Sequence, residues 1–102
     1  MSMPEEIIVE IWGIRINRKC ASLLKICFEH PEVLYKKRAL EGLIDNGCVK
    51  ALEYVCLNHP YDQFKAVALD ALIGMRAYGA LENIALNHPY ELFRLKAMQA
   101  LR

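Results

Sequence analysis

At 102 residues the chain is long enough for one domain with a modest core and too short for a second. Apolar residues make up 55% and charged residues 25%, which argues against disorder, and a net charge of +1 creates no overall field for nucleic acid or an anionic membrane. No apolar run approaches the ~20 residues of a membrane-spanning helix.

The first predicted element covers residues 4–16, which we interpret as a lone helix that caps the rest of the chain. Ile11, Ile14 and Asn17 lie in register with residues of a second helix predicted over 31–45. The stretch IIVEIWGIRI is nevertheless rich in β-branched residues, so a strand is the rival interpretation.

The rest of the chain is predicted to form three pairs of helices. Leu52, Val55 and Cys56 show the i, i+3, i+4 spacing of one helix face, and Pro60 then breaks the pattern before a second helix. The predicted pairs are 18–29 with 31–45, 48–59 with 60–74, and 77–88 with 89–101.

A repeat of 29 residues underlies these pairs. Residues 81–102 match residues 52–73 at 11 of 22 positions without a gap, and residues 23–44 match 52–73 at 9 positions. A helix pair of this length cannot bury its apolar faces alone, whereas stacked copies can. We therefore expect one domain over 1–102, with repeats at 18–45, 48–74 and 77–101.

A shared pattern marks the second helix of each repeat: an aromatic residue, Lys or Arg, then Ala, a small residue and Leu. It occurs as Tyr35-Lys36…Ala39…Gly42-Leu43, Phe64-Lys65…Ala68…Ala71-Leu72 and Phe93-Arg94…Ala97…Ala100-Leu101. This pattern resembles the Val-Arg-x-x-Ala-Ala-x-Ala-Leu core of the short HEAT-like repeats found in phycobilin lyases, with His in place of the family's usual Asp before the turn proline.

The resemblance covers nearly the whole chain after residue 20. It implies an all-α solenoid of about three 29-residue HEAT-like helix-hairpin repeats, preceded here by the N-terminal capping helix. Relatives on this scaffold bind proteins, attach bilins, recognise damaged DNA or carry a di-iron site, so the resemblance points to a fold and not to one function.

His30, His59 and His88 stand at the same place in the three repeats, each followed by Pro. At the end of a first helix, a histidine can hydrogen-bond the unpaired carbonyls and favour the negative end of the dipole. A row of parallel side chains ~8–10 Å apart does not converge on one metal ion. We predict structural turn residues and no metal site.

The four cysteines lack CxxC spacing, and the stretch MSMPEEIIVE has acids where a secretory signal needs bases. We therefore expect a cytoplasmic protein with reduced thiols. Cys20 and Cys48 lie near the starts of consecutive first helices, where stacked repeats should hold them too far apart for a disulfide. Cys27 and Cys56 occupy equivalent, apolar positions.

Lys36, Lys65 and Arg94 form a row along the second helices. Acidic residues lie around this row, so a structural charge ladder is favoured over contact with nucleic acid. No Gly-rich phosphate loop, paired-carboxylate signature or serine motif is visible, and we expect neither catalysis nor a cofactor. The predicted partner surface consists of Lys36, Tyr61, Lys65, Asp70, Tyr90 and Arg94.

The leading functional hypothesis is a non-catalytic protein–protein interaction module or assembly subunit. The alternatives are a subunit of a bilin-lyase-type complex and, third, a nucleic-acid binder that uses the basic row. Apolar residues beyond a single stripe at both ends of the repeat array also predict self-association as a homodimer. The residues assigned to that contact are Trp12, Leu92, Leu95 and Met98.

Overall fold

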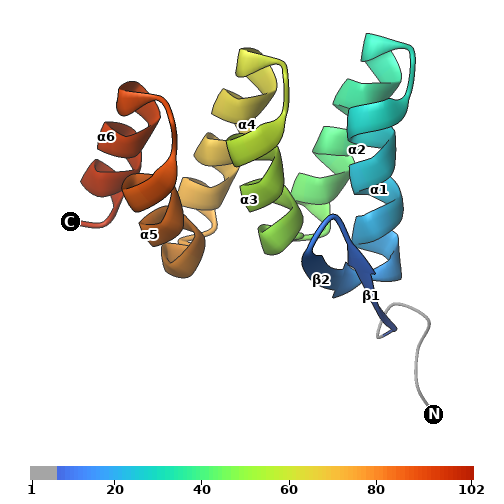
Figure 1. Cartoon of the computed structure of the whole chain (residues 1–102), viewed down its shortest axis with the longest axis horizontal. Coiled ribbons are helices and arrows are strands. Elements are labelled where there is room, and N and C mark those ends of the chain that lie inside the picture. Colours follow the sequence, from blue (N-terminus) through green and yellow to red (C-terminus); the bar gives the residue numbers. More distant parts are fainter. Residues whose placement is uncertain (1–6) are drawn as a thin grey trace. The chain divides into compact units, whose positions relative to one another are not determined.

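The computed structural model describes residues 7–102, and this part of the chain is mostly helical, with two strands and six helices (Figure 1). In chain order they are β1 (Ile8–Ile11), β2 (Ile14–Asn17), α1 (Arg18–Glu29), α2 (Val33–Asp45), α3 (Val49–Asn58), α4 (Asp62–Gly74), α5 (Tyr78–Asn87) and α6 (Glu91–Ala100). All six helices that the periodicity predicted between residues 18 and 101 are confirmed. None of the described helices is long and apolar enough to cross a membrane.

The predicted N-terminal capping helix is wrong over residues 8–16, and residues 4–6 of that prediction lie outside the described residues. This segment is an antiparallel hairpin in which Val9 pairs with Ile16 and Glu10 with Arg15. Trp12 (φ 50°) and Gly13 (φ 87°) form a two-residue turn with both residues at positive φ, the geometry that matches the twist of paired strands. β-Branched side chains favour the extended conformation on either side.

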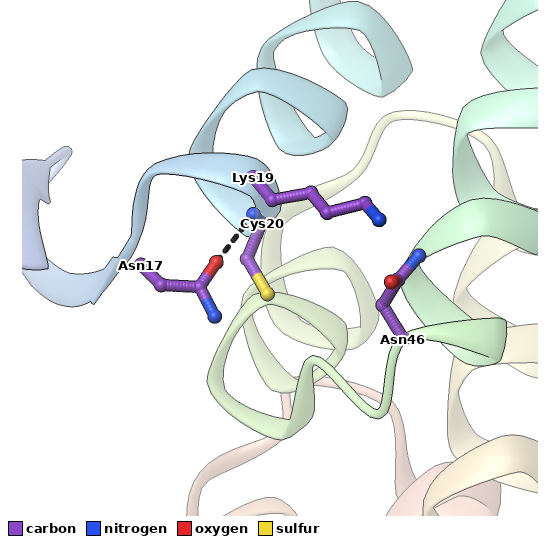
Figure 2. A pocket seen from close by; sticks show the side chains of 4 residues that line it. All are labelled: Asn17, Lys19, Cys20 and Asn46. Atoms are coloured by element: carbon purple, nitrogen blue, oxygen red, sulfur yellow. Dashed lines mark hydrogen bonds between the residues drawn. The ribbon is translucent and has the colours of Figure 1, made fainter. Parts of the chain in front are cut away.

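The helices group into two compact units that divide between Ala51 and Leu52. In the first unit the hairpin contacts α1, and α1 packs along α2. Gly42 allows this approach, because a Cβ atom there would lie 3.2 Å from a methyl carbon of Leu23. The side-chain oxygen of Asn17 accepts a 2.8 Å hydrogen bond from the backbone N–H of Cys20 and so caps α1 (Figure 2).

The prediction that Cys20 and Cys48 are reduced thiols, too far apart for a disulfide, is also wrong. The two residues form a disulfide with their Cα atoms 5.9 Å apart. The two residues are 28 positions apart, one fewer than the repeat length. Cys20 therefore lies inside the first turn of α1, whereas Cys48 precedes α3. Gly47, at φ 63°, turns the chain just before Cys48, so the spacing of equivalent helix positions does not apply.

The second unit contains α4, α5, α6 and most of α3. Its core is aliphatic and fully buried, and α5 packs against both α4 and α6. Asp62 and Glu91 lie in the first turns of α4 and α6, where their negative charge interacts favourably with the positive helix end. The fully buried core side chains include Leu52, Val55, Leu69, Leu72, Leu81 and Ile84.

Candidate functional site

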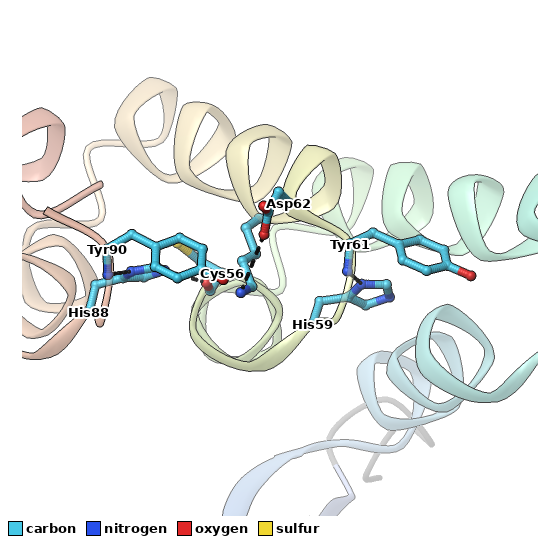
Figure 3. A network of polar contacts seen from close by, with 7 residues as sticks. Cys56, His59, Tyr61, Asp62, His88 and Tyr90 are labelled. Carbon is cyan, nitrogen blue, oxygen red and sulfur yellow. Dashed lines mark hydrogen bonds and ion pairs between the residues drawn. The ribbon is translucent and has the colours of Figure 1, made fainter. Parts of the chain in front are cut away.

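The three His-Pro turns share one hydrogen bond. In each of them the Nδ1 atom of the histidine accepts the backbone N–H two residues later, at 3.0 Å. The donors belong to Glu32, Tyr61 and Tyr90, which are the N-cap residues of α2, α4 and α6. Figure 3 shows two of these turns, with Nδ1 of each ring facing the tyrosine backbone. The histidines thus set the direction in which the second helix begins.

His88 uses its other ring nitrogen as well. Because Nδ1 accepts a hydrogen bond, the proton of the neutral ring is on Nε2, which donates to the carbonyl oxygen of Cys56 at 2.8 Å. His88 is only 1% exposed, and its ring also contacts those of Tyr90 and Phe93. Burial lowers the pKa of His88 from its usual value, against the opposing effect of the bond to Cys56.

Both nitrogens of His88 are therefore occupied by hydrogen bonds within the protein. The prediction that these histidines are turn residues agrees with this geometry, although the carbonyl that His88 reaches belongs to α3 and not to its own helix. Residues 7–102 contain no group of three or more His, Cys, Asp or Glu side chains placed to hold a metal ion.

Lys65 and Arg94, two members of the predicted basic row, both contact the turn that contains His88 and Tyr90. Lys65 is 7% exposed, and its Nζ atom lies 4.4 Å from the ring centroid of Tyr90 and 3.6 Å from a carboxylate oxygen of Asp62. The Nη1 atom of Arg94 donates to the backbone carbonyl oxygen of His88 at 2.6 Å. Lys65 and Arg94 hold the turn together, as a structural ladder would, and Lys65 has almost no surface to offer a phosphate.

The other predicted partner residues are more accessible. Tyr61 and Tyr90 are 37% and 44% exposed, and Asp70 is exposed and forms an ion pair with Lys96. Lys36 is half-buried on α2, in the other unit. Tyr61 and Tyr90 are therefore accessible at the surface, whereas Lys65 is not.

An open pocket of about 500 Å³ lies beside Tyr90, and sequence reasoning missed it. Asp62 contributes a carboxylate from the start of α4, while Glu91 contributes one from the start of α6. Leu92 is 77% exposed at the edge of this pocket. The sequence contains a signal for it, an acidic residue two places after both Pro60 and Pro89. The lining residues are Asp62, Pro89, Tyr90, Glu91, Leu92 and Phe93.

The residues assigned to self-association are exposed. On α6, Leu95 and Met98 are each 45% exposed and continue the stripe that begins at Leu92. Trp12 is 40% exposed at the hairpin turn, with the edge of its ring packed on Phe28 at 5.1 Å between centroids.

Two cysteines remain as thiols, Cys27 and Cys56, and both are fully buried. Burial raises the pKa of each thiol to about 12. Neither is a thiolate at neutral pH, so neither has the ionised sulfur that a nucleophile needs. Comparison with known proteins adds no candidate activity, because no family model, curated protein or solved structure matches the chain.

Proposed function

We propose that the chain is a non-catalytic protein-interaction module built as a solenoid of short HEAT-like repeats. Three helix pairs follow one another with a 29-residue sequence period, and each pair turns through the same His-Pro hydrogen bond. Repeats of this kind stack their helix pairs and leave one edge available to partners. The proposal assigns the partner surface to the turn edge of the second unit.

The observation that carries this assignment is the exposed pocket beside Tyr90. An aliphatic side chain that is 77% exposed, Leu92, stands there next to an aromatic ring and two carboxylates. Burial of a leucine side chain contributes roughly 1.5–3 kcal/mol. Aromatic anchors surrounded by polar groups are typical of the energetic centre of a protein interface.

Pre-organisation also favours this surface. Tyr90 is held by the bond from its backbone N–H to His88 and by Lys65 against its ring. A tyrosine fixed in this way loses little conformational entropy when a partner covers it. The basic row gives the nucleic-acid alternative no comparable support, because Lys65 and Arg94 are engaged within the protein.

The test compares two leucines with equal exposure. Leu92 borders the pocket, whereas Leu86 is also 77% exposed but lies on α5 and does not line it. Wild-type, Leu92→Asp and Leu86→Asp proteins are immobilised and exposed to an extract of the source cells, and retained proteins are quantified by mass spectrometry.

We expect wild type and Leu86→Asp to retain the same protein, and Leu92→Asp to retain at least ~10-fold less, as loss of one buried leucine predicts. Equal retention by all three proteins would remove the pocket from the interface. Circular dichroism confirms that both variants keep the helix content of wild type.

A further inference from the structure

The Cys20–Cys48 disulfide links the first turn of α1 to the residue before α3, and α2 lies between them in the sequence. Cys20 is the third residue of α1, and Cys48 is the last residue before α3, so the bond ties the start of one helix to the start of another. The packing of α1 on α2 does not depend on this bond alone, because the two helices also approach closely where Gly42 faces a methyl group of Leu23. Cleavage would thus release the two helix starts and leave the helix pair in place.

Cys20 and Cys48 are each 5% exposed, and a pocket borders the disulfide on the side of Cys20. An open pocket of about 370 Å³ is lined by Asn17, Lys19, Cys20 and Asn46. Figure 2 shows the sulfur of Cys20 directed into the space bordered by the two asparagines. Cys48 does not belong to this lining. An incoming thiolate therefore meets the sulfur of Cys20 first, and Cys48 becomes the leaving group.

The surroundings of Cys20 favour negative charge. Cys20 lies in the first turn of α1, where the helix dipole is positive, and that turn contains no acidic residue. The side chain of Lys19 lines the same pocket. Sulfur anions at helix N-termini beside a cation are stabilised, and an anionic thiol is attracted to the same place.

The other two cysteines provide the contrast. Cys27 and Cys56 are fully buried in the core, and neither lines the pocket beside Cys20. Their burial opposes thiolate formation. Thiol–disulfide exchange is therefore favoured at the Cys20–Cys48 pair over the two buried thiols.

We propose that Cys20–Cys48 is a thiol–disulfide exchange site for small thiols that carry a carboxylate, and that exchange there reversibly unties the start of α1 from the start of α3. This inference does not depend on the proposed partner surface, which lies in the other unit.

The chemistry balances with two equivalents of the external thiol. A first thiolate, RS⁻, attacks the Sγ atom of Cys20, the bond to Cys48 breaks, and the Cys48 thiolate takes a proton from solvent. A second thiolate attacks the external sulfur of the mixed disulfide, which releases RSSR and the Cys20 thiolate, and this thiolate also takes a proton from solvent. The protein gains two electrons and two protons, and two external thiols lose them.

The first experiment traps the mixed disulfide with oxidised glutathione as the probe. Cys48→Ser leaves Cys20 as the accessible thiol, and Cys20→Ser leaves Cys48; both variants also carry Cys27→Ala and Cys56→Ala. We expect the Cys20 thiol to acquire glutathione at least ~10-fold faster than the Cys48 thiol, because Cys20 lines the pocket with Lys19 and lies in the first turn of a helix, which stabilises its thiolate. Equal rates, or a faster reaction at Cys48, would overturn the assignment.

The second experiment keeps the native disulfide intact at the start. Wild-type, Lys19→Ala and Lys25→Ala proteins are reduced by glutathione, which is anionic, and by 2-mercaptoethanol, which is neutral. Lys25 is the matched control, because it is exposed on α1 but lines a different pocket. Alkylation followed by mass spectrometry counts the released thiols over time.

We expect Lys19→Ala to slow reduction by glutathione ~2- to 5-fold, the size of one screened charge interaction, with little change for 2-mercaptoethanol. Lys25→Ala should match wild type with both reagents. If Lys19→Ala changes both reagents equally, or if no glutathione ratio opens the disulfide in folded protein, the exchange site is refuted.

Discussion

The Nε2 atom of His88 donates a hydrogen bond to the carbonyl oxygen of Cys56, 2.8 Å away and 32 residues earlier in the chain. Both residues are buried, at 1% and 0% exposure. A buried carbonyl that loses its partner has no water to replace it, which costs roughly 1–3 kcal/mol. His88 is therefore a cross-helix support as well as a turn residue.

Replacement of His88 by Asn separates these two roles. The side-chain oxygen of Asn can still accept the backbone N–H of Tyr90, but the shorter side chain cannot reach the carbonyl of Cys56. We expect His88→Asn to lower the free energy of unfolding by roughly 1–3 kcal/mol. Urea denaturation followed by circular dichroism measures it. His30→Asn, at a half-buried turn of the same type, should cost less. Equal losses would show that the Cys56 bond contributes nothing.

The lowered pKa of His88 predicts acid sensitivity. The folded protein holds this ring neutral, whereas in the unfolded chain the ring takes up a proton near its ordinary pKa of about 6.5. Stability from His88 is thus fully present above that pH and is lost as the pH falls toward the folded pKa. We expect the urea midpoint to decline between pH 7.5 and pH 5, and His88→Asn to show a shallower decline. A parallel decline in the two proteins would assign the effect to other groups.

The disulfide should stabilise the folded chain. Closing a loop with a sequence separation of 28 removes conformational entropy from the unfolded state worth about 3–4 kcal/mol. Under oxidising conditions, we expect the double variant Cys20→Ser and Cys48→Ser to have a free energy of unfolding lower than that of wild type by this amount. Urea denaturation measures the difference. With reductant present, wild type and the double variant should converge. A difference that persists after reduction would mean that the serines disturb packing.

Self-association through α6 remains a prediction. Leu92, Leu95 and Met98 form an exposed apolar stripe that two copies can cover by two-fold pairing, in competition with the partner proposed for Leu92. Light scattering at micromolar concentration should give twice the chain mass of 11.7 kDa. Leu95→Glu should restore the single-chain mass with unchanged helix content, whereas Leu86→Glu on α5 should not. A wild-type mass near 11.7 kDa would reject the dimer.

Much of the helical architecture was readable from the sequence. Because the 29-residue repeat occurs three times, a wrong helix assignment in one copy is exposed by comparison with the other two. The proline at each turn also limits where the second helix can begin. Asn46 and Gly47 end α2, because glycine adopts the positive φ that the turn requires. These are local effects, and local effects recur with the sequence that causes them.

The hairpin and the disulfide were missed for different physical reasons. Ile11 and Ile14 fit a helical spacing, yet they pair across the hairpin turn. Trp12 at φ 50° is an unusual residue for such a turn, so the sequence lacked the Asn-Gly signal. The disulfide depends on the path of the chain at Gly47, which brings Cys48 toward Cys20 outside the repeat register.

The candidate site was only partly predictable. The exposed positions of Tyr61 and Tyr90 followed from their place beside each turn proline. The burial of Lys65 did not, because it depends on the ring of Tyr90, which belongs to the next repeat. Such contacts between repeats could not be predicted from the sequence period. The period shows which positions are equivalent, but it does not show which side chains touch.

The bond between His88 and Cys56 has a consequence for how such a chain can lengthen during evolution. Its acceptor is a backbone carbonyl, and every residue type supplies one, so this bond places no requirement on the side chain at the acceptor position. Ala85 occupies the position of Cys56 in the following copy, and a tandem duplication appended there would find the same acceptor. A copied segment that contains the histidine can form the same hydrogen bond to the backbone of the copy before it. The number of copies can therefore change without a matching mutation in the older part of the gene.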